Sequence, residues 1–320
     1  MAWNSLLPVL LLIIASSKAF DLSARRTSFR SRSALGSSSS STCPPPLVDL
    51  RRQTLEAALV KMAAISETDF SSAFNKRRMR SVEVKESSIP GAGLGVFAKE
   101  KIKAGTIIAF YPVHTLGIDI GESIQKVSID ETGQMKHEIE SAEDEDSSSK
   151  DQSYLIHVLG NRPLMGADIR QELGGAIFVN VDLGQQEQPG FISHRINDGA
   201  TVAANSVEGV LEYYRSSRTA KNCVIIPFGP SPLLATVTTR KIKKGDELFT
   251  TYGCSYWLEA LVKETEETAD LTVEPIVLEA KNVAMDILKA MRDAAVTNAS
   301  EAEELQAIFD APESYHLMRV

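Results

Sequence analysis

The sequence predicts a β-rich α+β fold, and three observations support this. Short runs in which apolar and polar residues alternate, as they do in strands, recur through residues 83–258 between glycine turns. The flanking segments 43–82 and 259–320 instead carry apolar residues at helical spacing. The 320 residues are 43% hydrophobic and 24% charged, so the chain can bury the core of one or two domains.

The start of the chain has the composition of a targeting sequence. The apolar run Leu6–Ala15 is too short to span a bilayer, and the small residues Ser17 and Ala19 follow it as at a signal-peptidase site. We interpret residues 1–19 as a signal peptide. Residues 20–42 are rich in Arg and Ser and almost free of acid, as transit peptides are. Together the two resemble the bipartite presequence of complex plastids, so we expect a plastid location; the alternative is secretion or the endomembrane system.

Charge and cysteine content exclude several classes of function. The formal net charge is −8 and the sequence pI is about 5.3, which argues against direct nucleic-acid binding. Cys43, Cys223 and Cys254 are too few and too scattered for a disulfide framework or a Cys-rich zinc site. We expect Cys223 to be a small buried apolar residue. We expect no metal ion, and no membrane association of the mature form.

The first elements surround a glycine-rich loop. After a boundary at Pro44–Pro46, a helix is predicted through about residue 64. Its apolar face comprises Leu50, Leu55, Leu59 and Met62. Short strands are then predicted at Val82–Val84, Val96–Ala98 and Ile107–Phe110. The loop contains Gly91, Gly93 and Gly95, where the backbone must turn with positive φ or approach another group closely.

The middle of the chain is less regular. The segment of about 118–150 carries the charged, Ser-rich run Ser141–Asp151, and we interpret this segment as a solvated loop or a disordered excursion. Strands are predicted again at Tyr154–Val158 and Ile177–Asp182. We expect His157 to be a strand residue rather than a metal ligand, because no second ligand lies at a useful spacing.

A polar phrase, GFISHRINDGA at Gly190–Ala200, comes before a segment with helical character. In that segment, Thr201–Ala220, Val210 and Tyr214 lie at helical spacing. The next strand is predicted at Val224–Phe228.

The stretch Ala235–Trp257 predicts a strand, a tight turn at Lys244–Gly245 and a second strand at Glu247–Phe249. The first strand should be half-buried, because Ala235, Val237 and Thr239 alternate with smaller or polar neighbours. Tyr252-Gly253 follows the second strand. The acidic tail is predicted to be helical, with an apolar face of Ala280, Ala284, Ile287, Leu288 and Met291.

These phrases, in this order, resemble the SET-domain protein lysine methyltransferases. GAGLGVFAKEKIKAGTIIAFY is similar to the family's N-terminal motif, ISHRINDGA to its central motif, and RKIKKGDELFTTYG to its C-terminal motif. The resemblance spans residues 83–258 and implies a SET (β-clip) core of small sheets with a knot-like C-terminal motif. The central motif departs from the family pattern, because His194 stands for the usual Arg, Arg195 for Phe, and Asp198-Gly199 for His-Ser.

The resemblance implies methylation of lysine side chains in a protein substrate, with S-adenosylmethionine as cofactor. Tyr252 would orient the amine or methyl group, and Tyr154 would wall the lysine channel; these are the candidate catalytic residues. Asn197 would accept a hydrogen bond from the ammonium of the cofactor. The candidate cofactor-binding residues are Gly93, Leu94, Gly95, His194, Asn197, Asp198, Tyr252 and Trp257, the last near the adenine.

Two alternatives remain open. A catalytically inactive SET or β-clip module that binds a protein partner fits the altered central motif, whereas the glycine loop and Tyr252 favour the enzyme. A chromatin histone methyltransferase is opposed by the presequence, unless residues 1–42 have another role.

Overall fold

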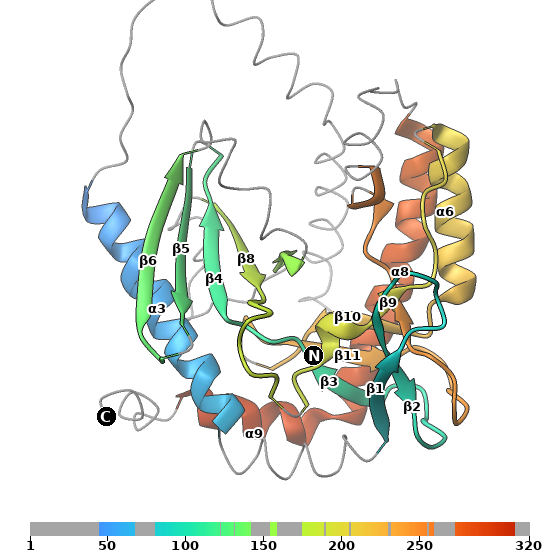
Figure 1. The fold of residues 1–320 in the computed structure, drawn as a ribbon, viewed down its shortest axis with the longest axis horizontal. Helices are drawn as coiled ribbons and strands as arrows, with labels where there is room; N and C mark the ends of the chain where they lie inside the picture. Colours follow the sequence, from blue (N-terminus) through green and yellow to red (C-terminus); the bar gives the residue numbers. More distant parts are fainter. Residues whose placement is uncertain are drawn as a thin grey trace, which may run out of the picture. The chain divides into compact units, whose positions relative to one another are not determined.

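The computed structural model describes residues 45–67, 81–121, 123–130, 132–141, 154–158, 175–188, 190–204, 206–229, 232–254, 256–258 and 273–310 (Figure 1). The predicted presequence and the acidic run beyond Ser141 lie outside these ranges. The described residues form helices and several small, mainly antiparallel sheets, so the predicted fold class is confirmed.

The chain divides into two compact units, which are described separately. The larger unit contains Pro44–Asn197, Asn222–Phe249 and Ala290–Val320, and the smaller contains Asp198–Lys221 and Thr250–Lys289. The chain therefore passes from the larger to the smaller unit at the peptide bond after Asn197.

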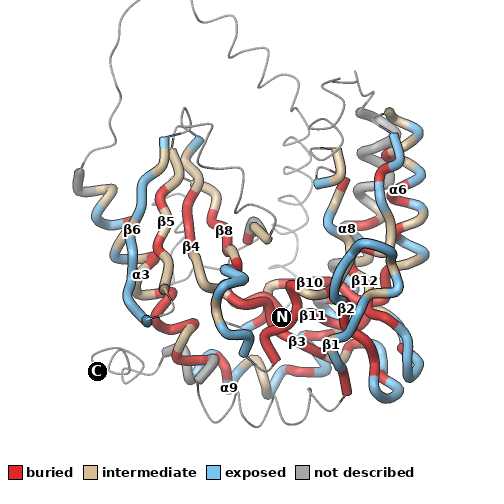
Figure 2. The backbone as a smooth tube through the Cα atoms, viewed as in Figure 1, coloured by how far each residue is buried: buried red, intermediate tan, exposed pale blue. Residues whose placement is uncertain are grey.

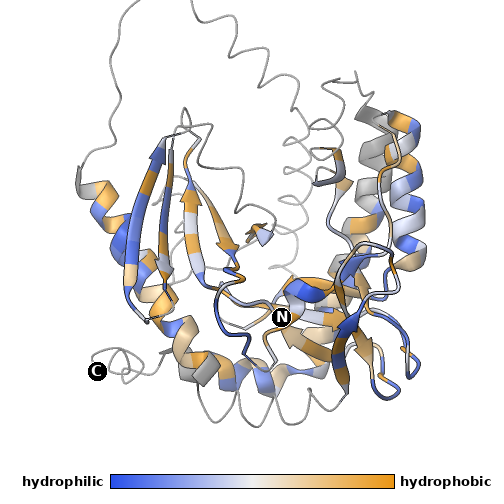
Figure 3. Ribbon diagram, in the orientation of Figure 1, coloured by the Kyte–Doolittle hydropathy of each residue, from blue (hydrophilic) through white to orange (hydrophobic). Residues whose placement is uncertain are grey.

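A five-stranded sheet in the larger unit corrects one prediction. Its strands, in the order β6-β5-β4-β8-β7, are β6 (Met135–Ser141), β5 (Ser123–Ile129), β4 (Thr115–Asp119), β8 (Ala176–Asn180) and β7 (Ile156–His157). The solvated loop predicted from residue 118 is wrong up to Ser141. Hydropathy alternation does not reveal β6, because most of its residues are exposed and polar (Figure 3). Lys126 on β5 forms cross-strand ion pairs with Glu138 and Glu140 on β6. These pairs stabilise the pairing of two strands whose side chains face water.

Helix α3 (Pro45–Glu67) lies against β5 and β4 and also contacts α9 (Ala299–Asp310). The Gln125 Nε2 of β5 donates a hydrogen bond to the Val48 carbonyl of the helix, at 2.7 Å. Leu55, Leu59 and Met62 are buried as predicted, but Leu50 is 47% exposed. Leu50 precedes Leu55 by five residues, which places it about 140° away around the helix.

The core of the larger unit is formed around a three-stranded sheet. Its strands, in the order β10-β11-β3, are β10 (Cys223–Pro227), β11 (Leu234–Thr238) and β3 (Ile107–Phe110) (Figure 2). Cys223 is fully buried, as predicted. A two-stranded sheet pairs β1 (Val82–Glu86) with β2 (Leu94–Ala98).

Strand β11 is buried along both faces, so the predicted half-buried strand is wrong. Its polar residues lie in the interior because their hydroxyls have partners there. Thr236 Oγ1 donates to Ser193 Oγ at 2.6 Å, and Thr238 Oγ1 donates to the Lys103 carbonyl at 2.6 Å. A threonine in a central strand therefore looks polar in the sequence although its hydrogen bonds are satisfied internally.

The predicted second strand after the Lys244–Gly245 turn does not pair with β11. The backbone of Asp246–Leu248 instead bonds β2: Ala98 N donates to Asp246 O at 2.9 Å, and Leu248 N donates to Val96 O at 2.8 Å. The strand β12 is confined to Phe249–Thr250, and it forms a two-stranded sheet with β9 (Asn197–Asp198).

In the smaller unit, the segment after the central phrase forms helix α6 (Val207–Ala220), as predicted. Ser206 caps it by accepting a hydrogen bond from Gly209 N at 3.1 Å. The buried residues Val210, Tyr213, Tyr214 and Ser217 lie on one face at helical spacing. Helix α8 (Val273–Thr297) confirms the helical tail, although most of its predicted apolar face lies outside the described side chains.

Two kinds of feature are absent from the described part of the chain. No helix there is both long and apolar enough to cross a membrane. The same residues contain no group of three or more His, Cys, Asp or Glu side chains that could hold a metal ion.

Candidate active site

The glycine loop satisfies both sequence-based expectations, at different glycines. Gly91 and Gly93 have φ of 80° and 70°, a region that residues with a side chain rarely adopt. Gly95 has an ordinary φ, but a Cβ there would overlap Glu247 Oε1 and lie 3.3 Å from Asn197 Nδ2. The loop therefore turns at its first glycines and passes close to other groups at its last.

The carboxylate of Glu247 holds this loop and was not predicted as a site residue. Its Oε1 accepts from Ser87 Oγ at 2.7 Å and from Asn197 Nδ2 at 3.4 Å. Its Oε2 accepts from Ser88 N at 2.8 Å and from Ser88 Oγ. Glu247 is only 6% exposed, so these donors replace the water that its charge loses. One carboxylate thus joins the segment before the glycine loop to the central phrase.

Asn197 bonds the glycine loop directly. Its Nδ2 donates to the Leu94 carbonyl at 3.0 Å, and the side chain of Leu94 is exposed. Two candidate cofactor-binding residues 103 positions apart in the chain are therefore in contact. The side-chain amide nitrogen of Asn197 is committed to the protein, and its amide oxygen is the atom suited to accept from a ligand.

His194 lies on the short 3₁₀ turn η3 (Ser193–Arg195), beside Tyr154. The two rings meet edge to face with centroids 6.1 Å apart, and the Tyr154 carbonyl accepts from Tyr111 OH at 2.7 Å. Glu187 Oε1 is 3.4 Å from His194 Nε2, but the same oxygen accepts from Arg195 Nε at 3.1 Å. Among the described residues, no hydrogen-bond partner meets His194 Nδ1.

Burial lowers the pKa of His194 from 6.5 to about 4, and the positive charge of Arg195 and the nearby His114 act in the same direction. Burial also lowers the pKa of His114, whose Nδ1 accepts from Asp182 N at 3.0 Å. Both side chains line a cavity of about 290 Å³ in the larger unit, together with Glu187 and Arg195. At neutral pH the cavity therefore presents a neutral imidazole from His194.

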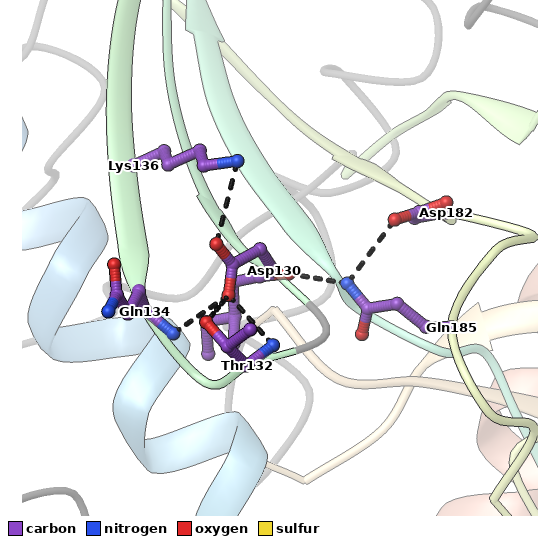
Figure 4. Close-up of polar contacts among 7 residues, drawn as sticks. Asp130, Thr132, Gln134, Lys136, Asp182 and Gln185 are labelled. Atoms are coloured by element: carbon purple, nitrogen blue, oxygen red, sulfur yellow. Dashed lines mark hydrogen bonds and ion pairs between the residues drawn. The ribbon is translucent and has the colours of Figure 1, made fainter.

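Contacts with the β5–β6 turn hold the segment that leads into the central phrase (Figure 4). Gln185 Nε2 donates to the Ile129 carbonyl and lies 3.5 Å from Asp182 Oδ2. In the turn itself, the Asp130 carboxylate accepts from Thr132 and from Gln134 N. The hydrogen bond from the Thr132 side chain is the main reason that the pKa of Asp130 is lowered to about 2. The Asp130 hydrogen bonds thus hold the turn, and the bond from Gln185 to Ile129 ties the segment before the central phrase to the end of β5 beside it.

In the smaller unit, Asp198 is the centre of a second hydrogen-bond network. Its Oδ2 accepts from Tyr213 OH at 2.6 Å, from Tyr252 N at 2.9 Å and from Trp257 Nε1 at 3.1 Å. Its Oδ1 accepts from Ala200 N at 3.1 Å. Burial raises the pKa of Asp198, while these four donors oppose the rise. Asp198 is 4% exposed, so the protein provides most of its partners.

Three aromatic rings gather beside this carboxylate. Tyr252 stacks on Trp257 with centroids 6.2 Å apart and an interplanar angle of 16°. Tyr256 meets both rings edge to face, at 5.0 Å each. Tyr252 and Tyr256 are 38% and 40% exposed, so the cluster presents ring surface to solvent. The candidate residues Asp198, Tyr252 and Trp257 are therefore brought together within one unit, as Leu94, Gly95 and Asn197 are within the other.

Comparison with known proteins identifies the family. A family model described as the SET domain matches residues 93–253, just over half of the chain. The chain belongs to the SET-domain family. The match begins at Gly93 in the glycine loop and ends at Gly253 after Tyr252, so it includes Asn197 and the two carboxylates, Asp198 and Glu247, at the centres of the networks. No match was found among curated proteins.

Two solved structures are similar at low identity. One is the ATXR5 SET domain in complex with histone H3 dimethylated on R26, with 14% identity and a TM-score of 0.31, covering 66% of this chain and 91% of that one. The other is ATXR5 in complex with histone H3.1 monomethylated on R26, with 13% identity and a TM-score of 0.32, covering 73% and 96%. These scores carry no argument about the site.

Sequence reasoning missed Glu247 and Tyr213. Glu247 lies within the GDEL phrase of the SET motif, where it was interpreted as part of a strand. Tyr213 could have been found from periodicity, because it follows Val210 by three residues and shares its buried face. Both are polar residues that act on other parts of the protein, which hydropathy does not detect.

Replacing Glu247 with Gln should lower the free energy of unfolding by about 1–3 kcal/mol, because the amide NH₂ would face a donor in either orientation. Denaturant unfolding measures this. The control is Asp246→Asn in the neighbouring exposed turn, where Asp246 Oδ2 accepts a hydrogen bond from Lys243 N at 2.9 Å. That change should cost less than about 1 kcal/mol. Equal losses in the two variants would contradict the role given to Glu247.

The lowered pKa of His194 predicts that stability falls as the pH falls. The unfolded chain binds a proton at this residue near pH 6.5, and the folded chain binds it only near pH 4. Stability present above pH 6.5 is therefore lost towards pH 4, by about 3 kcal/mol from this group. Unfolding measured at steps of pH should show that loss in the natural sequence and its absence in His194→Gln. Parallel curves for the two proteins would mean that His194 is not held neutral.

Proposed function

We propose that this SET protein is an S-adenosylmethionine-dependent methyltransferase that acts on lysine side chains of a protein substrate. SET-domain proteins are generally protein methyltransferases, and the family match covers the motifs that would form such a site. The observation that carries the proposal is the hydrogen bond from Asn197 Nδ2 to the Leu94 carbonyl. It joins the family's central motif to its glycine loop, the two parts assigned to cofactor binding.

The residues present suit the chemistry of the cofactor. Residues 91–94 are exposed, a Cβ at Gly93 would meet no other atom within 4 Å, and Leu94 has 45% of its surface exposed. Asn197 would offer its amide oxygen to the ammonium group, and the backbone of Asp198 would bind the carboxylate. Trp257 would contribute ring surface to the adenine. His194 would contact the cofactor through its buried, neutral imidazole.

The cofactor, when bound, would supply a methyl group on a positively charged sulfur; the amine nitrogen would bond the methyl carbon in line as the carbon–sulfur bond breaks, and the sulfur would leave as a neutral thioether. The protein must present that amine without its proton, although a free lysine has a pKa near 10.4. An apolar channel disfavours the charged form and so lowers that pKa. Tyr252 would orient the amine through its hydroxyl, and Tyr154 would form a wall of the channel. Holding the amine in line then provides much of the rate.

The substrate is proposed to be a protein with an accessible lysine-containing segment. The similar ATXR5 structures contain histone H3 peptides, which is a property of those proteins. Residues 1–42 lead us to propose a plastid location, with delivery by a signal peptide followed by a transit peptide.

The second candidate is a catalytically inactive SET module that binds a protein partner. The replacement of the family's His-Ser by Asp198-Gly199 favours it. The four hydrogen bonds that Asp198 accepts favour the enzyme, because they are those of an integrated residue rather than of a decayed site.

Calorimetric titration with S-adenosylmethionine separates the two candidates. The natural chain should bind with micromolar affinity, and Asn197→Ala should weaken binding at least about tenfold, since a buried hydrogen bond to a charged group contributes about 1.5–3 kcal/mol. Asn180→Ala, which alters an asparagine on β8, should retain the natural affinity. Absence of binding by the natural chain would favour the inactive module.

A further inference from the structure

Two departures from the SET pattern meet in the smaller unit. The chain has an inserted segment, Thr201–Ala220, which forms helix α6, and it has Asp198 where the family has His. Tyr213 of that helix donates a hydrogen bond to Asp198 Oδ2 at 2.6 Å. The two side chains are 1% and 4% exposed, so little water competes for this bond.

The single proton of Tyr213 determines the directions of the remaining bonds. Burial, followed by the charge of Asp198, raises the pKa of Tyr213 far above its ordinary value, so the hydroxyl keeps its proton. That proton is donated to Asp198, and the phenol oxygen accepts from Gly253 N at 3.0 Å. The contact with Thr251 Oγ1, at 2.9 Å, must then have Thr251 as donor.

Asp198 and Tyr213 together hold three consecutive residues of the C-terminal motif. Thr251 and Gly253 bond the Tyr213 hydroxyl, and the backbone N–H of Tyr252 bonds Asp198. Trp257 Nε1 bonds the same carboxylate oxygen, which also fixes the ring that stacks on Tyr252.

We propose that Tyr213 is a positioning residue, which acts through Asp198 and through Thr251–Gly253 to fix Tyr252 and Trp257. Helix α6 and Asp198 thus act as one device that replaces the family's central-motif His. The inference rests on the proposed function for its effect on cofactor binding, while the positioning itself is a property of the smaller unit.

The neighbouring Tyr214 provides a matched control. It lies on the same helix, is 5% exposed, and donates its hydroxyl to Cys254 Sγ at 3.3 Å. Removing either hydroxyl deletes one phenol oxygen from the same buried helix face. Of these two hydroxyls, the one on Tyr213 donates to Asp198 and the one on Tyr214 donates to Cys254. A purely structural role for the helix face therefore predicts similar effects for the two changes.

The test uses the full chain with Trp3→Phe, in which Trp257 becomes the only tryptophan. Tyr213→Phe and Tyr214→Phe are then compared by steady-state anisotropy and acrylamide quenching of Trp257, and by calorimetric titration with S-adenosylmethionine. Tyr213→Phe should lower the anisotropy, increase the quenching and weaken binding at least about tenfold, the scale of one charge-assisted hydrogen bond. Tyr214→Phe should resemble the parent in all three measurements.

Each outcome decides one question. If Tyr213→Phe and Tyr214→Phe behave alike while the parent binds the cofactor, the inference is wrong and the proposed function stands. If the parent does not bind, the proposed function is wrong, and the fluorescence of Trp257 alone decides whether Tyr213 positions it.

If Tyr213→Phe does not fold, Thr251→Val replaces it, because this change removes only one donor to the Tyr213 hydroxyl. It should loosen Trp257 in the same direction and to a smaller extent. An unchanged Trp257 in Thr251→Val would then overturn the inference.

Discussion

The carboxylate of Asp198 is the group on which the smaller unit depends. A buried charge without hydrogen-bond partners is costly. Four donors from separate parts of the chain provide the partners of Asp198. The donors are the backbone N–H groups of Ala200 and Tyr252, the hydroxyl of Tyr213 on helix α6 and the indole N–H of Trp257. Because one carboxylate satisfies all of them, the position of Tyr252 is tied to a helix that lies outside the family's motifs.

The larger unit solves a similar problem with Glu247. This carboxylate lies where Gly95 has no side chain, and it accepts bonds from both serines before the glycine loop and from Asn197. Gly95 and Glu247 therefore depend on each other. A side chain added at position 95 would displace the Glu247 carboxylate from its hydrogen bonds. Asn197 belongs to the Glu247 network of the larger unit, and the next residue, Asp198, is the centre of the network of the smaller unit.

Most of the fold could be predicted from the sequence because its strands are short, apolar and separated by glycine. Strands β4, β5 and β6 were not predicted, and in β5 and β6 charged cross-strand pairs replace the apolar alternation that identifies a strand. Strand β11 was assigned correctly but with the wrong burial, because Thr236 and Thr238 satisfy their hydroxyls internally. Pattern reasoning identifies residues that face water or the core, and it fails where polar groups pair with each other.

The candidate site shows the same division. The family motifs predicted Asn197, the glycine loop, Tyr252 and Trp257, and the structure brings these into two groups with short contacts. Motifs could not predict Tyr213, because it lies in an inserted segment that has no counterpart in the pattern. They also could not show that Asp198, a departure from the motif, is one of the most extensively hydrogen-bonded side chains described.

The most direct test of the account is transfer of an isotopically labelled methyl group from S-adenosylmethionine to proteins of a cell extract, with the labelled residue identified by mass spectrometry. The natural chain should label lysine ε-amines, and Tyr252→Phe should reduce the transfer or change the number of methyl groups added per lysine. If the natural chain binds the cofactor but labels no lysine, or if Tyr252→Phe gives the same rate and product, Tyr252 does not serve a lysine methyltransferase site.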